Sequence, residues 1–180
     1  MTNVFVAGSR RVSHLTADVR RRLDEMIQRE LAILVGDANG ADKAIQAHFA
    51  ARSYKNVTVF CTAGDCRNNV GGWPIRAVPA PHRVRDFAFF TAKDAAMADE
   101  ADVGLMLWDG QSTGTMVNVA RLIARGKITV VYLSPGTKFF TVKTAEDLDA
   151  ILLTTTPKVR AKIEESIGEH VTEFAQPQMF

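Results

Sequence analysis

The sequence lacks any uninterrupted apolar segment near the roughly 20 residues that a membrane-spanning helix needs. Its N-terminus passes directly into residues 3–8 (NVFVAG), without the basic region and long apolar segment of a signal peptide. Cysteine is scarce: Cys61 and Cys66 do not resemble the disulfide framework of a small secreted domain, and Cys61 is interpreted as a small apolar residue at the end of a buried strand. These absences lead us to expect a cytoplasmic protein with no membrane partner.

Neither sign of charge is in large excess. The 22 lysines and arginines against 20 aspartates and glutamates leave a net charge of +2. So small an excess gives no electrostatic reason to expect a nucleic-acid surface, and we therefore expect no nucleic-acid partner. Hydrophobic residues make up 47% of the 180 positions and charged residues 23%, a balance typical of a folded protein. A chain of this length is long enough for one domain with a sizeable core and too short for two ordinary domains.

Short apolar segments alternate with helical patterns along most of the chain. Strands separated by helices of this length indicate an α/β fold, in which helices cover both faces of a mostly parallel sheet. The expected architecture is a Rossmann-like three-layer sandwich with five strands in the order 3-2-1-4-5. The strands are predicted at residues 3–7, 31–35, 56–61, 103–108 and 127–133, and the helices at 16–29, 41–51, 86–100 and 113–125.

Two regions depart from this alternation. Residues 62–85 contain a glycine pair, three prolines and no clear period, which indicates a long loop or flap. In this loop, Trp73 either anchors the segment to the core or stacks on a ligand. Residues 136–180 hold a short strand at 139–142 and helices at 145–153 and 157–170. We therefore divide the chain into a Rossmann-like domain over residues 1–135 and a C-terminal helical appendage that packs on the sheet edge or on a partner.

Three loops rich in glycine and polar residues follow the first, second and fourth predicted strands. They are residues 8–10 (GSR), 35–43 (VGDANGADK) and 109–115 (DGQSTGT). In an open parallel sheet, ligands bind beyond the carboxyl ends of the strands near the place where the strand order reverses. The three loops are therefore expected to meet around one ligand.

The first loop offers Gly8, Ser9 and Arg10. Glycine permits close approach of the backbone, serine supplies a hydroxyl group, and arginine supplies a planar fork for phosphate or carboxylate. The alternative is a tight turn with an arginine on the surface.

The second loop combines sharp turns with the start of a helix. Gly36 and Gly40 let the chain turn. The backbone amides that follow would point out of a helix N-terminus, where the helix dipole favours an anion. These amides belong to Ala41, Asp42 and Lys43.

The polar side chains of the second loop have both functional and structural interpretations. Asp37, at the tip of the predicted strand, is the candidate for contact with a ribose hydroxyl or a base. Asn39 either contacts the ligand or caps the helix, and Asp42 either contacts the ligand or compensates the helix dipole.

The third loop has more hydroxyl groups and glycines than a helix cap requires. One hydroxyl group is enough to cap a helix, so three of them beside two glycines match an anion cradle. The sequence has neither the Gly-Lys-Ser/Thr of a Walker loop nor a Gly-x-Gly-x-x-Gly after the first strand. The cradle residues are Gly110, Ser112, Thr113, Gly114 and Thr115, and Asp109 is placed to contact ribose or base.

Together, residues 6–10 (VAGSR), 35–42 (VGDANGAD) and 101–115 (ADVGLMLWDGQSTGT) resemble the SLOG superfamily. These are the Rossmann-like domains shared by the SMF/DprA proteins and the LOG phosphoribohydrolases, and the pattern is most similar to the YspA-type branch of small bacterial proteins. The resemblance covers about residues 3 to 134. It implies a pocket for a nucleotide or a nucleotide-derived ligand and, in some branches, cleavage of an N-glycosidic bond.

Two positions depart from the LOG pattern. LOG enzymes carry a glutamate in Gly-Thr-x-x-Glu, where this chain has Asn118 after Gly114-Thr115-Met116-Val117. An amide cannot exchange a proton as a carboxylate does, although Asn118 is still placed to hydrogen-bond a ribose. The same enzymes place an arginine where this chain has Lys93, which holds a phosphate as a point charge without bidentate geometry.

The expected function is the binding of a nucleoside monophosphate, an ADP-ribose-like ligand or a nucleotide-sugar. Residues 110–115 and 40–43 would cradle phosphate, while Arg10 and Lys93 balance its charge. One alternative is an N-glycosidase or deoxyribosyltransferase in which Asp109 and Asp37 replace the missing glutamate. A second alternative is a DNA-associated protein, by analogy with the SMF/DprA branch.

The sequence gives little indication of cofactors or partners other than this ligand. Cys61, Cys66 and His82 would supply only three of the four ligands of a zinc site, so we expect no metal. No cofactor is assigned apart from the nucleotide itself. A homodimer is expected because related folds often pair through exposed helices.

Overall fold

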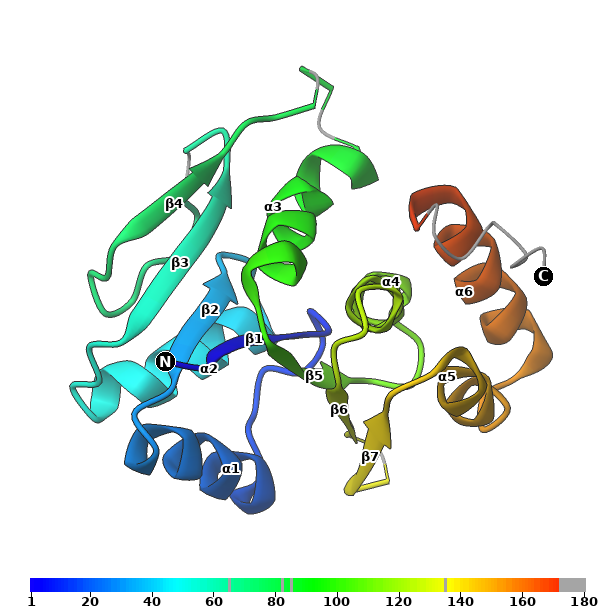
Figure 1. Cartoon of the computed structure of the whole chain (residues 1–180), viewed down its shortest axis with the longest axis horizontal. Coiled ribbons are helices and arrows are strands. Elements are labelled where there is room, and N and C mark those ends of the chain that lie inside the picture. Colours follow the sequence, from blue (N-terminus) through cyan, green and yellow to red (C-terminus); the bar gives the residue numbers. More distant parts are fainter. Residues whose placement is uncertain (65, 82, 85, 135, 172–180) are drawn as a thin grey trace.

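The computed structural model describes residues 1–64, 66–81, 83–84, 86–134 and 136–171. Its centre is a seven-stranded sheet in the order β4-β3-β2-β1-β5-β6-β7 (Figure 1). Neighbouring strands run parallel except β6 and β7, which are antiparallel. The strands are β1 (Asn3–Gly8), β2 (Ala32–Gly36), β3 (Val57–Thr62), β4 (Ile75–Val78), β5 (Val103–Trp108), β6 (Thr129–Leu133) and β7 (Lys138–Val142).

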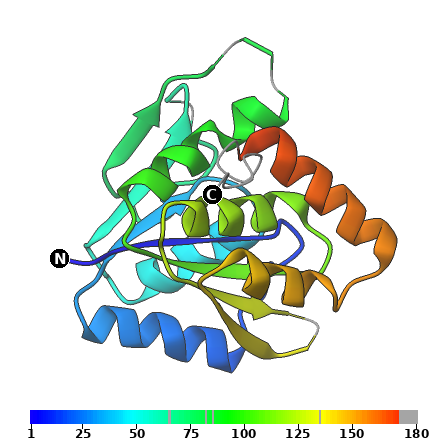
Figure 2. The same ribbon diagram turned by 45° about the vertical axis from the view of Figure 1, so that its right-hand side comes forward.

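Helices cover both faces of the sheet. Two of them, α1 and α2, pack on one face, while α3 and α4 pack on the other, with α5 and α6 outside α4 and β7 (Figures 1 and 2). The predicted α/β three-layer sandwich is confirmed. The helices are α1 (Ala17–Gln28), α2 (Ala41–Ala51), α3 (Phe87–Glu100), α4 (Thr113–Ala124), α5 (Ala145–Leu152) and α6 (Pro157–His170).

The alternation of side chains along β1 shows why the sheet is buried on both faces. Val4 and Val6 belong to the hydrophobic cluster under α1 and α2, whereas Phe5 and Ala7 belong to the cluster under α3 and α4. Successive strand residues point to opposite faces, and every one of these is apolar, so β1 is a central strand.

The predicted order of five strands is confirmed as the central part of the sheet, but two further strands extend its edges. The strand β4 lies within the predicted loop over residues 62–85 and pairs with β3. Three of its four residues are exposed, so it has no apolar alternation that a sequence pattern could detect. Trp73 anchors the preceding loop, since it is 6% exposed and its Nε1 donates to the carbonyl of Tyr54 at 2.8 Å.

The C-terminal segment shares a core with the central sheet. Val142, Leu148, Ile151 and Ile163 are at most 2% exposed and belong to the same hydrophobic cluster as α4. The strand β7 adds to the edge of the sheet beside β6. The division of the chain at residue 135 stays a prediction.

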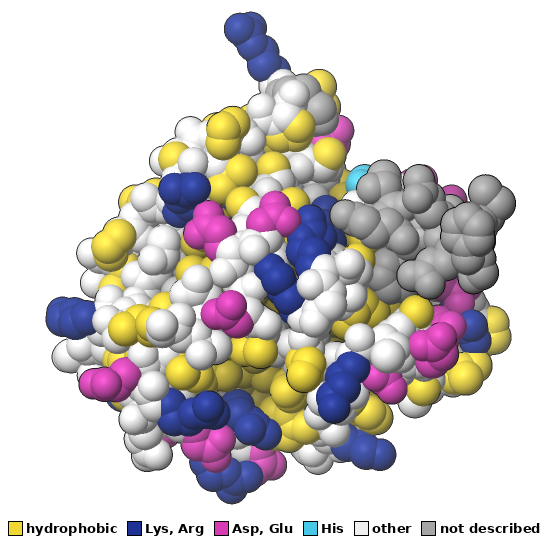
Figure 3. Space-filling model, viewed as in Figure 1, with side chains coloured by type: hydrophobic (Ala, Val, Ile, Leu, Met, Phe, Trp, Pro, Cys, Tyr) yellow, Lys and Arg dark blue, Asp and Glu magenta, His cyan; other side chains and the backbone are white. Residues whose placement is uncertain are grey.

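The surface mixes charges of both signs. On the face in Figure 3, lysine and arginine side chains lie among aspartate and glutamate side chains. On α1, Arg21 pairs with Asp18 at 2.8 Å and Arg22 with Glu25 at 3.6 Å. Within the described ranges, no helix combines the length and the apolar character that crossing a membrane requires.

Candidate functional site

A pocket of about 650 Å³ opens at the carboxyl ends of the central strands. Its walls come from the loops after β1, β2 and β5, from the loop after β3, from the first turns of α3 and α4, and from α6. The order of the strands reverses at β1, which lies between β2 and β5. Position and volume are both typical of a small-molecule site, for which about 300–1,000 Å³ is usual.

The start of α4 is open toward this pocket. The side chain of its N-cap residue, Ser112, makes no capping hydrogen bond. Asp109 Oδ1 accepts hydrogen bonds from the amides of Gln111 at 2.9 Å and Ser112 at 2.7 Å, which fixes the loop. Among the described residues, the next two amides, of Thr113 and Gly114, have no acceptor. They are unsatisfied donors at the positive end of a helix dipole.

Three hydroxyl groups form a chain behind this helix start. Ser9 Oγ lies 3.1 Å from Thr115 Oγ1, which donates to Ser112 Oγ at 3.1 Å. Ser9 Oγ also accepts from the amide of Asp109 at 3.1 Å. Because Ser9 is only 1% exposed, its role in this structure is to tie the β1 loop to the β5 loop rather than to line the pocket.

The start of α2, by contrast, is closed by the chain itself. Its N-cap residue, Gly40, makes no side-chain cap, but the amide of Ala41 donates to the carbonyl of Ser9 at 3.3 Å. A Cβ atom on Gly40 would overlap the carbonyl group of Arg10, and φ there is +84°, so only glycine fits. Lys43 is exposed and does not line the pocket. The β1 loop therefore occupies the first amide of the predicted cradle at residues 40–43, and Asp42 alone of these four residues lines the pocket.

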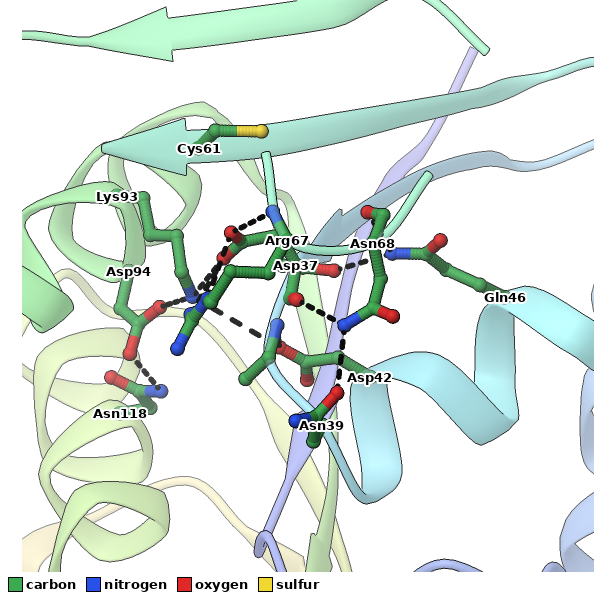
Figure 4. A network of polar contacts seen from close by, with 12 residues as sticks. Asp37, Asn39, Asp42, Gln46, Cys61, Arg67, Asn68, Lys93, Asp94 and Asn118 are labelled. Atoms are coloured by element: carbon green, nitrogen blue, oxygen red, sulfur yellow. Dashed lines mark hydrogen bonds and ion pairs between the residues drawn. The ribbon is translucent and has the colours of Figure 1, made fainter. Parts of the chain in front are cut away.

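Lys93 is the centre of a buried charge cluster that forms part of the pocket wall (Figure 4). Its Nζ lies 2.9 Å from Asp94 Oδ1, 3.8 Å from Asp37 Oδ1 and 3.9 Å from Asp42 Oδ2. Burial lowers the pKa of Lys93, but these three carboxylates outweigh burial and the pKa is raised. Lys93 is therefore a fixed cation that holds three acidic groups together.

Asp37 is fully engaged by the loop that follows β3. Arg67 donates to its carboxylate from Nε at 3.1 Å, from Nη2 at 2.8 Å and from the backbone amide at 3.0 Å. Burial raises the pKa of Asp37, but these hydrogen bonds and the charge of Lys93 outweigh burial and lower it. Asp37 does not line the pocket. The catalytic roles of Asp37 and Asp109 stay a prediction, and in this structure both carboxylates position the chain.

Asp42 is a buried pocket carboxylate whose pKa is raised toward neutral pH. It is 4% exposed, and its Oδ2 accepts from the amide of Ala38 at 3.1 Å. Burial raises its pKa to about 6, against the attraction of Lys93. A Cβ atom on Gly36 would overlap Asp42 Oδ2 and lie 2.6 Å from Lys93 Nζ. Glycine at position 36 therefore allows the two charged groups to approach.

Asn118 lines the pocket but already has partners at both ends of its amide. Its Nδ2 donates to Asp94 Oδ2 at 3.1 Å, and its Oδ1 accepts from Arg121 Nη1 at 3.0 Å. Arg121 is itself buried, and burial lowers its pKa against the attraction of Asp94. Asn118 thus extends the charge cluster into α4, and the predicted ribose contact would use its remaining amide hydrogen.

An aromatic wall completes the pocket. The ring of Phe90 on α3 has the guanidinium carbon of Arg67 at 5.4 Å and that of Arg10 at 5.8 Å from its centroid, within cation–π range. Phe87, one turn earlier, also lines the pocket and stacks on the ring of His170 at 4.5 Å. A planar group bound here would contact Phe90 and the two guanidinium groups.

The predicted site residues separate into two groups. Those that line the pocket are Gly8, Arg10, Asp42, Lys93, Asp109, Ser112, Thr113, Gly114, Thr115 and Asn118. Those that lie outside the lining are Ser9, Gly36, Asp37, Asn39, Gly40, Ala41, Lys43 and Gly110. Lining residues absent from the prediction include Arg11, Arg67, Phe87, Phe90, Asp94 and Lys162. Arg11 could have been predicted from its position next to Arg10, whereas no feature of the sequence connects Lys162 with the site.

The cysteines differ from their interpretation in one respect. Cys61 is buried at the end of β3, but it is joined to Cys66 in a disulfide with the two Cα atoms 5.2 Å apart. In the part of the chain that the structure describes, no group of three or more His, Cys, Asp or Glu side chains is arranged to hold a metal ion. His82 lies outside the described residues.

Fold and site together define a Rossmann-like α/β protein with a polar pocket at the carboxyl edge of its sheet. Neither a protein-family model nor a curated protein matches the sequence. A solved structure with a similar fold is DNA processing protein A from Helicobacter pylori, described for its single-stranded DNA binding mode. The TM-score is 0.53 at 15% sequence identity, over 94% of this chain and 81% of that chain. At this identity, the similarity establishes a shared fold.

The expectation that nucleic acid is excluded as a partner is wrong. It was based on the net charge of +2, yet a protein with a similar fold binds single-stranded DNA. Net charge averages over the whole surface, whereas Arg10, Arg11 and Lys162 gather around one pocket. Neither the fold nor the small net charge therefore excludes a nucleic-acid partner.

Proposed function

We propose that the protein binds a nucleotide or a nucleotide-derived ligand, with a phosphate group at the start of α4. The observation that carries the proposal is the pair of amides of Thr113 and Gly114, which lack an acceptor among the described residues and belong to residues that line a pocket with Arg10 and Arg11. Unsatisfied amides at a helix N-terminus, beside arginine side chains, form a recurrent phosphate site.

Other residues that line the pocket are suited to the base and the ribose of a nucleotide. The ring of Phe90 supports stacking of a base beside Arg10 and Arg67. Asp42 and Asp94 line the pocket as hydrogen-bond acceptors for ribose hydroxyls or base amino groups. The order of the three loops on this fold also supports membership of the SLOG superfamily, with the YspA-type branch as the nearest pattern.

The substitution Gly114→Asp is expected to weaken nucleotide binding at least about tenfold, or about 1.4 kcal/mol. A Cβ atom on Gly114 would meet only Phe87 Cε2, at 3.8 Å, so an aspartate fits without displacing the backbone. Its carboxylate would take the place of the phosphate at the amides of α4, where the helix dipole stabilises it. Titration calorimetry with AMP, ADP, ADP-ribose and a nucleotide-sugar measures the loss.

The matched control is Gly168→Asp. Gly168 lies on α6, does not line the pocket, and a Cβ atom there would meet nothing within 4 Å. This variant is expected to bind as the unmodified protein does. Unchanged affinity in Gly114→Asp would contradict the assignment of the phosphate to α4, and no binding of any nucleotide at millimolar concentration would contradict the proposed function as a whole.

A second candidate is the binding of single-stranded nucleic acid, favoured by the similarity to DNA processing protein A. The same pocket features would serve it, since a strand presents phosphates to the start of α4 and bases to Phe90. Under this proposal, a mononucleotide occupies only part of the natural ligand's site.

For this candidate, a fluorescent oligothymidylate is expected to bind with a Kd of about 1–100 μM at 50 mM salt and to weaken as salt rises. Fluorescence anisotropy measures the affinity and its salt slope. Gly114→Asp is expected to weaken this binding, and Gly168→Asp is expected to leave it unchanged. Absence of binding at low salt would eliminate the nucleic-acid candidate and leave the nucleotide proposal in place.

A further inference from the structure

Lys162 reaches the pocket from a part of the chain that no sequence pattern connected with it. It lies on α6, yet it lines the same pocket as the start of α4 and the loop after β1. The C-terminal segment therefore contributes to the site as well as to the hydrophobic core.

The helix that carries Lys162 is held firmly in place. Ile163 and Ile167 belong to the hydrophobic cluster that also contains α4. Thr156 caps the helix by accepting from the amide of Val159. At its other end α6 meets the start of α3, where the rings of His170 and Phe87 lie 4.5 Å apart (Figures 1 and 2). Lys162 therefore projects from a fixed wall of the pocket.

Lys162 forms no ion pair with a carboxylate of the residues that the structure describes, whereas Arg160 on the same helix pairs with Glu164. Arg10 and Arg11 also form no ion pair with a described carboxylate. The other two pocket cations, Lys93 and Arg67, are held by the acidic groups of the buried cluster.

The remaining pocket carboxylates face backbone amides. Asp86 Oδ1 accepts from the amide of Phe89 at the start of α3. Asp109 Oδ1 accepts from two amides before α4. Both carboxylates are thus engaged at a helix start. Among the described residues, the pocket cations Arg10, Arg11 and Lys162 form no ion pair and are available to an anionic ligand.

We infer that the pocket takes a ligand with two linked phosphate groups, and that Lys162 contacts the second of them. The inference rests on the proposed function, in which the first phosphate binds the amides of α4. Arg10 and Arg11 line the pocket from the loop after β1, while Lys162 lines it from α6, which packs against α4. Lys162 is thus a specificity residue that favours a diphosphate over a monophosphate.

Inorganic pyrophosphate and orthophosphate test this inference without assuming a base or a sugar. Titration calorimetry is expected to show that the protein binds pyrophosphate at least about tenfold more tightly than orthophosphate. In Lys162→Met this preference is expected to fall to about twofold or less, with orthophosphate affinity changed by less than about threefold. A second arm with ADP and AMP identifies the source of the diphosphate, because a nucleotide gains affinity over the inorganic ions through its base and ribose.

Lys158→Met is the matched control, because Lys158 is exposed on the same helix and does not line the pocket. It is expected to retain the full preference for pyrophosphate. If Lys162→Met weakens the binding of pyrophosphate and orthophosphate equally, or weakens neither, the specificity role of Lys162 is overturned. A wild-type protein that binds orthophosphate as tightly as pyrophosphate would overturn the diphosphate inference alone, whereas binding of neither ion nor nucleotide would remove the proposed function.

Discussion

Replacing Lys93 with methionine lowers the free energy of unfolding by an expected 3–5 kcal/mol or thereabouts, because removing one partner of a buried ion pair leaves uncompensated charge in the interior. The ammonium group of Lys93 lies between the carboxylates of Asp37, Asp42 and Asp94, and the residue as a whole is 4% exposed. Methionine fills a similar volume, so charge is lost with little change in packing. Urea denaturation, followed by the fluorescence of the two buried tryptophans, measures the loss.

Two further variants show whether the loss comes from charge. Lys55→Met removes an exposed lysine between α2 and β3 and is expected to change the free energy of unfolding by less than about 0.5 kcal/mol. Adding Asp94→Asn to Lys93→Met removes one of the uncompensated carboxylates and is expected to restore about 1 kcal/mol or more. A Lys93→Met variant as stable as the wild type would show that the cluster does not hold the site together.

Asp42→Asn is expected to raise the free energy of unfolding by about 3 kcal/mol at pH 8 and by less than about 1 kcal/mol at pH 4. Burial raises the pKa of Asp42 from 3.8 to about 6, so the folded state binds this proton more tightly than the unfolded state. The stabilisation from that proton is fully present below pH 3.8 and is lost as the pH rises through about 6. The interval between the two pKa values, at about 1.4 kcal/mol per unit, gives the expected magnitude.

The measurement is a comparison of the variant with the wild type at each pH from 4 to 8, because the contributions of other titrating groups then cancel. Asparagine keeps an acceptor for the amide of Ala38, and Lys93 keeps Asp94 as its nearest partner. Asp149→Asn replaces an exposed carboxylate and is expected to show no such dependence on pH. A stability difference that stays constant over this range would contradict the assignment of the titration to Asp42.

The central fold could be predicted because its strands are buried on both faces. The strand β5 runs from Val103 to Trp108 with five of its six residues buried, so its apolar run ends sharply where the loop begins. The edge strand β4 could not be predicted, because Ile75 and its neighbours are exposed and the strand exists only through its hydrogen bonds to β3. Periodicity identifies strands by burial, and an edge strand has little burial to identify.

The site was predictable where the topology alone determines it. Parallel strands end at one edge, so Arg10 and Asp109 were expected to meet there, and both line the pocket. Phe90 was not predicted, because an aromatic residue in an apolar helix pattern usually belongs to the core. Asp37 differs for another reason: its partner Arg67 lies thirty residues away, in a loop whose path no local pattern specifies.

The starts of α2 and α4 differ in whether the first backbone amide of the helix already has an acceptor. The first amide of α2 is bound by the carbonyl of Ser9, and α3 has a side-chain cap from Asp86. Among the described helix starts at this pocket, that of α4 has neither a side-chain cap nor an acceptor at its first amide. The acidic groups of Asp42 and Asp94 line another part of the same cavity. Under the proposed function, a ligand with both an anionic group and hydrogen-bond donors is therefore expected to bind in one orientation. Its anionic group would face α4, and its donors would face the carboxylates on α2 and α3.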